Sequence, residues 1–156
     1  MEVGCSEVII IDVPVTPPSV NHYKVPALIR TSNRATVKTW VLTPEAIAFR
    51  EWVCVKARGK TLAPQSKRDR DRVRYQIIAT VFLGKRQRGD ADNFWKCIAD
   101  SLQHAGVIHS DARARRLHIE VEDADRDNPH TLIVAMRCGR SKTLAERIAA
   151  KLQRKR

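Results

Sequence analysis

The sequence predicts one α/β (α+β) domain in which helices pack on a mixed β-sheet. The first observation is the order of the predicted elements: strand, hairpin, helix, strand, helix, strand, strand, helix. The second is the length of 156 residues, which suits a single core without disulfides or a structural metal. The third is a hydrophobic share of 43%, typical of a chain that folds. We expect residues 1–140 to form this domain and residues 141–156 to form a basic C-terminal helix or tail.

The N-terminal half begins with a β-branched run that predicts a strand over residues 7–15. Prolines end this strand because proline cannot donate to a strand ladder. Two weaker strands, 27–30 and 36–41, are predicted to form a hairpin. A threonine cap, a proline and a glutamate in sequence predict the start of a helix over 43–59, which a glycine ends. Residues 61–71 are predicted to be a polar loop.

The C-terminal half contains the clearest alternation of apolar and polar residues, which predicts a strand over residues 72–83. The later elements follow from the same patterns. They are a basic loop at 85–89, a helix at 92–105 ended by Gly106, a strand at 117–121, an acidic turn at 122–128, a strand at 131–137 and a basic amphipathic helix at 142–152.

The charge balance favours a polyanionic partner. Lysine and arginine number 29 against 17 aspartates and glutamates, a formal net charge of +12. In a small domain such a surplus is typical of a protein that binds nucleic acid. The alternative is a basic protein with a solvated surface and no such partner. Charge alone separates neither DNA from RNA nor an enzyme from a binding protein.

The cysteines and the apolar runs favour a cytoplasmic protein. Cys5, Cys54, Cys97 and Cys138 are scattered and form no Cys-x-x-Cys pair, so we expect reduced thiols. No apolar run approaches the roughly 20 residues of a membrane span. The N-terminus lacks the basic and apolar regions of a secretory signal. We therefore expect no membrane partner, and no pattern calls for a small-molecule cofactor.

The predicted helix at 92–105 is where the chemistry is expected. At 100° per residue, Asp92, Lys96 and Asp100 share one face, while an apolar stripe occupies the opposite face. Asp90 lies just before the helix, close enough to converge with Asp92 on one ion. Such oxygen ligands suit Mg²⁺ or Mn²⁺, and a nearby lysine suits the charge that develops in phosphodiester hydrolysis.

An interpretation in which these residues have only structural roles stays open. Asp92 is equally consistent with a helix N-cap, and Lys96 with Asp100 is consistent with an ordinary surface pair at i, i+4. A third acid, Asp111, follows the helix-ending Gly106 and a short link, residues 107–110. It approaches the N-terminus of the same helix only if that link folds back over it.

The spacing of these residues forms a longer motif, which reads Asp90-x-Asp92-Asn93-x-x-Lys96, then Asp100-Ser101-Leu102, then Ala105-Gly106-Val107 and Asp111. This motif resembles the core of the RusA family of Holliday-junction resolvases. The proline-rich segment that leads to Tyr23 and the helix start at Thr43 are similar to that family as well. The resemblance spans about residues 7–137, and its specific part is 88–111.

The resemblance implies a RusA-like endonuclease domain over 1–140 that acts in DNA recombination and repair. It implies that Asp90, Asp92 and Asp111 are metal-binding catalytic acids and that Lys96 stabilises the transition state or the leaving oxygen. It also implies a homodimer whose paired sites nick symmetric strands of a four-way junction. Such small resolvases are often carried by phages and prophages. One departure is that Ser110 replaces the first acid of the family's closing acidic pair.

Basic residues beside the acids are expected to meet DNA phosphates. The predicted nucleic-acid-binding residues are Lys85, Arg86, Arg88, Asn93, Arg113, Arg115 and Arg116. Two other functions stay open. One is a nuclease of the same fold that acts on other branched DNA. The other is a non-catalytic architectural protein whose acids are only caps and surface pairs.

Overall fold

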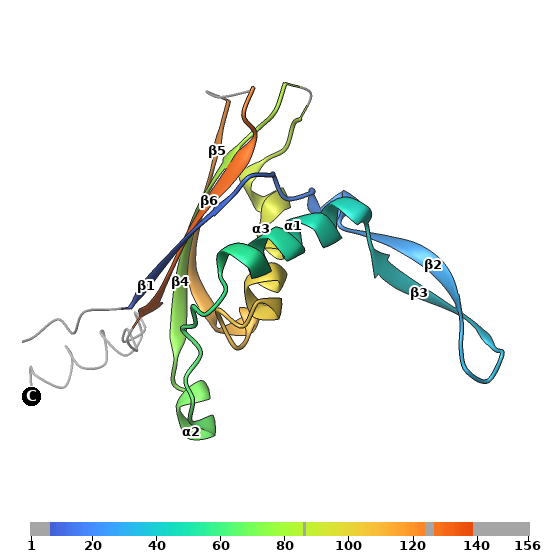
Figure 1. Ribbon diagram of the computed structural model, residues 1–156, viewed down its shortest axis with the longest axis horizontal. Helices are drawn as coiled ribbons and strands as arrows, with labels where there is room; N and C mark the ends of the chain where they lie inside the picture. The colour runs from blue at the N-terminus through green and yellow to red at the C-terminus, as the bar shows by residue number, and fades with distance from the viewer. Residues whose placement is uncertain (1–6, 86, 124–126, 139–156) are drawn as a thin grey trace, which may run out of the picture.

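A four-stranded mixed sheet forms the centre of the molecule (Figure 1). The computed structural model describes residues 7–85, 87–123 and 127–138. The strands are β1 (Val8–Val13), β4 (Arg74–Phe82), β5 (Ala114–Glu122) and β6 (His130–Cys138), in the order β1-β6-β4-β5. β6 pairs antiparallel with both β1 and β4, whereas β4 and β5 are parallel. The predicted mixed sheet is confirmed.

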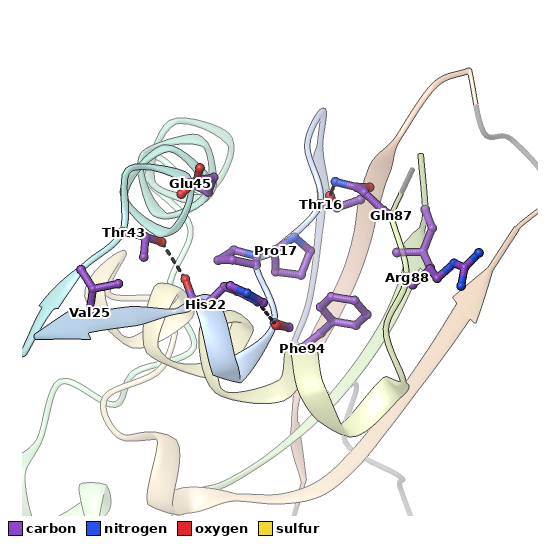
Figure 2. A pocket seen from close by; sticks show the side chains of 12 residues that line it. Thr16, Pro17, His22, Val25, Thr43, Glu45, Gln87, Arg88 and Phe94 are labelled. Atoms are coloured by element: carbon purple, nitrogen blue, oxygen red, sulfur yellow. Dashed lines mark hydrogen bonds between the residues drawn. The ribbon is translucent and has the colours of Figure 1, made fainter. Parts of the chain in front are cut away.

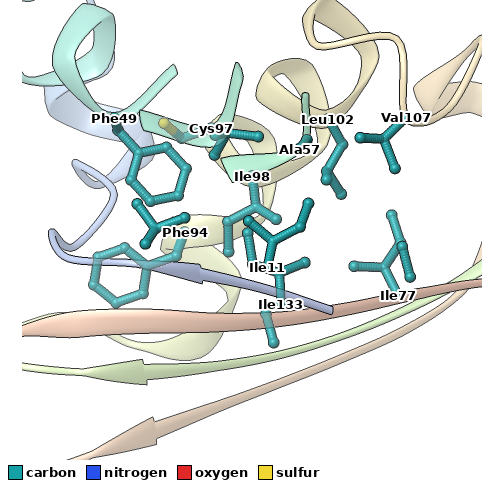
Figure 3. Close-up of a cluster of buried hydrophobic side chains, with 14 of the residues drawn as sticks. Ile11, Phe49, Ala57, Ile77, Phe94, Cys97, Ile98, Leu102, Val107 and Ile133 are labelled. Atoms are coloured by element: carbon teal, nitrogen blue, oxygen red, sulfur yellow. The ribbon is translucent and has the colours of Figure 1, made fainter. Parts of the chain in front are cut away.

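Two helices, α1 (Pro44–Lys56) and α3 (Ala91–His104), pack against each other and against the sheet. α3 connects the parallel strands β4 and β5. Its apolar face carries Phe94, Ile98 and Leu102, all buried as the helical wheel predicted. These side chains meet inward-facing sheet residues such as Ile77 and Ile133 in one core (Figure 3). The opposite face of α3 is left for the charged residues.

The start of α1 matches its sequence signature. The Thr43 side chain accepts a hydrogen bond from the backbone N–H of Ala46 at 3.3 Å, and Pro44 occupies the first helical position. Thr43 also donates its hydroxyl to the carbonyl oxygen of His22 at 2.9 Å, so this cap ties α1 to the N-terminal segment. That segment contains a short 3-10 turn, η1 (Val20–His22), followed by Tyr23.

The predicted hairpin is present and longer than expected. It consists of β2 (Lys24–Arg30) and β3 (Thr36–Leu42), which form a separate two-stranded sheet. This hairpin, called the arm below, projects away from the rest of the molecule (Figure 1). Antiparallel strands need only a short connection, and Arg34 takes a positive φ of 61° within it. Most arm side chains are exposed.

Two short elements were not predicted. One is α2 (Lys67–Arg70), which interrupts the expected loop at 61–71, and the other is a 3-10 turn, η2 (Asp111–Arg113). Three predicted segments lie wholly or partly outside the described residues. They are the helix at 142–152, the whole segment 141–156 and part of the acidic turn at 122–128. Within the described chain, no helix has the length and apolar character needed to cross a membrane.

Candidate active site

The start of α3 presents two carboxylates. Asp90 is the N-cap residue, with extended backbone angles, yet its side chain makes no capping hydrogen bond. Asp92 lies in the first helical turn and is exposed. Neither carboxylate has an ion pair to a residue of the described chain. The interpretation of Asp92 as the N-cap is therefore wrong, and helix capping explains neither acid.

Lys96 lies one turn further along and is held between two carboxylates. Its Nζ donates to Asp100 Oδ1 and to Asp111 Oδ2, both at 2.8 Å. Hydrogen bonds to Asp100 and then to Asp111 raise the pKa of Lys96 above its ordinary value. The same contact with Lys96 lowers the pKa of Asp111. Lys96 is thus a charged group whose ammonium position is fixed, which a simple i, i+4 pair would not achieve.

Tyr23 extends this network from the N-terminal segment. Its hydroxyl donates to the other oxygen of Asp100, Oδ2, at 2.8 Å, and the tyrosine side chain is buried. Burial, together with the hydrogen bond to Asp100, raises the pKa of Tyr23 well above its ordinary range, so this phenol stays neutral. Asp100 is therefore oriented from one side by Tyr23 and binds Lys96 on the other.

Asp111 reaches Lys96 because the chain reverses sharply after α3. Gly106 adopts a φ of +72°, its N–H donates to Gln103 O and the Val107 N–H donates to Leu102 O. This pair of bonds is the Schellman arrangement that ends many helices at glycine. Val107 and the residue after it are fully buried, which anchors the link. The link therefore folds back against α3, which brings Asp111 to Lys96 and not to the start of the helix.

Two side chains fix the end of this link. The backbone N–H of Asp111 donates to Gln103 Oε1 at 2.8 Å. Just before it, His109 Nδ1 and the hydroxyl of the buried Tyr75 are joined at 2.6 Å, with the rings edge to face. Burial, aided by the nearby Arg113, lowers the pKa of His109. Tyr75 and Gln103 thus hold Asp111 from the sheet and from α3.

The three predicted acids fall into two groups. Asp90 and Asp92 lie at the start of α3, whereas Asp111 lies against Lys96 and Gln103. The eight steps along the chain from Asp92 to Asp100 cover about 12 Å of helix axis. Among the described residues, no three histidine, cysteine, aspartate or glutamate side chains gather as a metal-binding group. The structure therefore brings Asp111 to Lys96, but not to the pair at the helix start.

The predicted phosphate-binding residues differ in their surroundings. Lys85 forms an ion pair with Asp127, and Arg113 binds the carboxylate of Asp71 at 2.9 Å and its carbonyl oxygen at 2.8 Å. The others have no ion pair to a described residue. They are the exposed Arg88, Arg115 and Arg116 and the half-buried Asn93. Arg86 lies outside the described residues.

Sequence reasoning missed the residues that position the charged groups. The helical wheel carried a signal for Gln103, because it falls at about 20° from Asp92, on the face of Lys96. Tyr23 was noted only as the end of the proline-rich segment. Nothing in the sequence indicated that Tyr75, one of the apolar positions of β4, would bind His109.

The comparisons with known proteins identify the family. The chain matches the family described as "Endodeoxyribonuclease RusA" over residues 15–136. A search of the curated proteins finds no match. The matched region contains every site residue described above and extends over most of the chain. The chain therefore belongs to the RusA family of endodeoxyribonucleases.

Proposed function

We propose that this protein resolves four-way DNA junctions by symmetric, metal-dependent nicking. The observation that carries the proposal is the start of α3, where two carboxylates without a described ion-pair partner stand beside a fixed lysine. In a chain with a net charge of +12, two neighbouring acids without a described ion-pair partner form a local negative site that can attract a cation. The recombination and repair of DNA in a bacterial or phage-infected cytoplasm is the setting that fits this activity.

The donor set at the helix start fits a hard divalent cation. Asp90 and Asp92 supply only oxygen ligands, and Mg²⁺ is usually held by one or two carboxylates plus substrate phosphates and water. Mn²⁺ accepts the same ligands. In this proposal Asp90 and Asp92 would hold the ion. Asp111 would be the third acid, and it could bind the ion only by giving up its hydrogen bond to Lys96. A bound ion supplies Lewis-acid polarisation of the phosphodiester and an activated water.

Lys96 provides the charge that the reaction needs at a fixed point. Its ammonium group is placed by Asp100 and Asp111, and Tyr23 orients Asp100. A preorganised positive group stabilises the charge that develops on a phosphate without reorganising during the reaction. Lys96 therefore acts on the transition state or the leaving oxygen, while Tyr23 and Asp100 are positioning residues.

DNA binding is assigned mainly to arginines without a described ion pair. Arg115 and Arg116 lie on β5, an edge strand of the sheet, and Arg88 lies on the loop before α3. Phosphate contacts of this kind fix the position of DNA but carry no sequence information. Lys85 and Arg113 already pair with acids, so their contacts with phosphate require an exchange of partners. Asn93 and Arg86 complete the predicted set.

A homodimer is part of the proposal, because two symmetric nicks need two sites. The arm supports it. One face of the arm carries Val25, Ala27, Ile29, Val37 and Val41 together with Thr39, and Ile29 and Val37 are 44% and 47% exposed. The opposite face exposes Leu28 and Trp40 at 74% and 65%. A two-stranded hairpin is marginally stable in water on its own, so the exposed apolar side chains of the arm are expected to be covered by the partner subunit.

The dimer is tested by one added charge on each face of the arm. Val37→Lys places a charge opposite Ile29, among apolar side chains, whereas Thr36→Lys places the same charge opposite Arg30, at the tip of the arm. In sedimentation velocity, Val37→Lys should yield monomers at concentrations where the wild type and Thr36→Lys remain dimers. A wild-type protein that sediments as a monomer would remove the dimer from the proposal.

The activity is tested with a synthetic four-way junction and a linear duplex of matched sequence, in Mg²⁺ and in EDTA. We expect paired nicks in the junction only, lost in EDTA. Asp90→Asn with Asp92→Asn should abolish nicking and leave junction binding intact or stronger, since two negative charges near phosphates are removed. The matched control is Asp12→Asn with Glu51→Gln, which removes two exposed charges elsewhere.

Two other functions are separated by the same experiment. A nuclease tuned to other branched DNA would cut three-way or flap substrates faster than four-way junctions. An architectural protein would bind without any dependence on metal and with a steep dependence on salt. The unpaired acids at the start of α3 argue against the architectural function, because they would weaken a protein that only binds phosphates.

A further inference from the structure

A cavity lies beside the start of α3 and has no role in the chemistry described so far. It has a volume of about 400 Å³, within the range of roughly 300–1,000 Å³ that is common for small-ligand sites. Called the α3 cavity below, it is lined by Thr16, Pro17, Pro18, Ser19, His22, Val25, Thr43, Glu45, Leu83, Gln87, Arg88 and Phe94.

The position of the α3 cavity links it to the acids. Phe94 follows Asp92 by two residues, and Arg88 precedes Asp90 by two. The walls come from the N-terminal segment, the start of α1 and the loop before α3, so the cavity opens where these three meet (Figure 2). Because Arg88 and Phe94 flank Asp90 and Asp92 along the chain, the cavity lies beside the loop and the first helical turn that carry the two acids.

Hydrogen bonds hold the walls of the α3 cavity in place. Gln87 accepts from the Gly84 N–H at 2.9 Å and donates to Thr16 Oγ1 at 2.6 Å, which ties the loop to the N-terminal segment. Ser19 Oγ and His22 Nδ1 are joined at 3.0 Å on the opposite side. A site that is already ordered loses less conformational entropy when a ligand enters.

The chemistry of the lining suits a flat, apolar ring with a polar edge. Pro17 and Phe94 are buried, so together they form an apolar floor of the cavity, against which the face of a base packs. Glu45 contributes a carboxylate that has no ion pair to a described residue, and a carboxylate accepts from the exocyclic amino group of a base. Arg88 lies at the rim, where the phosphate of the same nucleotide would meet a cation.

We propose that the α3 cavity receives one unstacked nucleobase from the strand that is cut, next to the scissile phosphate, and reads its identity. This inference rests on the proposed junction-cleaving function. A base leaves the stack at the lowest cost where stacking is already interrupted, as at the exchange point of a four-way junction. Phosphate contacts give the enzyme its position, and the cavity adds a preference for sequence.

Base insertion is measured in EDTA, so that binding is observed without cleavage. Single 2-aminopurine substitutions are placed at each position around the exchange point of the junction, and fluorescence is recorded with saturating protein. For the wild type we expect a rise at one position beside the cut site. Ser19→Leu, which fills part of the cavity, should remove that rise.

The control is Ser66→Leu. Ser66 and Ser19 are both N-cap residues of short helical turns with extended backbone and no capping hydrogen bond, but Ser66 is remote from the cavity. Ser66→Leu should keep the rise. A flat fluorescence profile for junction-bound wild type, or a rise that persists in Ser19→Leu, would overturn the inference.

Base identity is measured by cleavage in Mg²⁺ with each of the four bases at the inserted position. Glu45→Gln should reduce the ratio between the best and worst base by about fivefold or more. Glu51→Gln, on the same helix but outside the cavity, should leave the ratio unchanged. An unchanged ratio in Glu45→Gln would mean that Glu45 reads nothing and would remove base reading from the inference.

The failure of this inference is distinguishable from failure of the proposed function. If the wild type cuts junctions in Mg²⁺ but shows no insertion signal, the function stands and the role of the cavity is refuted. If the wild type neither binds nor cuts four-way junctions, both fall together.

Discussion

Gly89 is the position where a single methyl group should disturb the site most directly. An added Cβ would lie 2.5 Å from Cζ and 3.0 Å from Cε2 of the Phe94 ring. The ring is only 3% exposed and is packed in the core, so it has little room to move aside. Forcing extra volume into a packed site costs about 1–3 kcal/mol. We therefore expect Gly89→Ala to lower stability by that amount, through the contact and not through backbone strain.

In a domain of this size, 1 kcal/mol shifts the melting temperature by about 2–4 °C, so the expected decrease is about 2–12 °C. Circular dichroism melting measures it. Gly84→Ala is the matched control, because its Cβ would meet the flexible end of Gln87 at 3.3 Å. Phe94→Leu should partly relieve the clash, so the double variant should be less destabilised than the sum of the two single variants. Equal melting temperatures for Gly89→Ala and the wild type would refute this reasoning. So would a double variant whose destabilisation equals the sum of the two single variants.

Three further predictions concern single side chains. Lys96 lowers the pKa of Asp111, so the stability from this pair is present above about pH 4 and is lost as pH falls through the lowered pKa. Lys96→Met should raise the pKa of Asp111 in an NMR titration and reduce this loss of stability. Tyr75→Phe removes the bond to His109 and should cost about 1 kcal/mol in urea unfolding, unlike a substitution of an unbonded hydroxyl. Arg116→Ala should reduce the slope of log affinity against log salt by about one, equally for all DNA sequences, and an unchanged slope would exclude a phosphate contact.

Patterns of local sequence were sufficient to predict most of the fold. α3 was expected at 92–105 and is found at Ala91–His104, because its apolar stripe and its terminal glycine are both strong signals. The strand over 72–83 was equally clear, since its alternation persists for ten residues or more. By contrast, α2 consists of Lys67–Arg70, which has no apolar periodicity, so no pattern distinguishes this helix from a charged loop.

The candidate site was predictable in composition but not in arrangement. Motif spacing identified Asp90, Asp92, Lys96 and Asp111, yet only the backbone reversal at Gly106 decides which of these residues meet. Fifteen residues separate Lys96 from Asp111, and that contact depends on the burial of the link in a core contributed by distant segments. Long-range placement of this kind leaves no periodic signal in the sequence.

The tryptophans show the same limit. The exposed fractions of Trp40 and Trp52 are 65% and 40%. Trp40 lies on the arm and Trp52 on the outer side of α1. Large aromatic residues usually lie inside a protein, so hydrophobicity alone places them in the core. The sequence does not reveal that the arm leaves the body of the molecule.

The two edges of the four-stranded sheet differ in their resistance to aggregation. β5 is paired only with β4, and its exposed side chains include Arg115, Arg116, His118 and Glu120. Charges on an edge strand discourage another chain from adding to it. At the other edge, β1 exposes Val8 and Ile10, which are 50% and 57% accessible. In concentrated solutions or during refolding, unwanted strand addition should therefore begin at β1, while the charged outer edge of β5 should resist it.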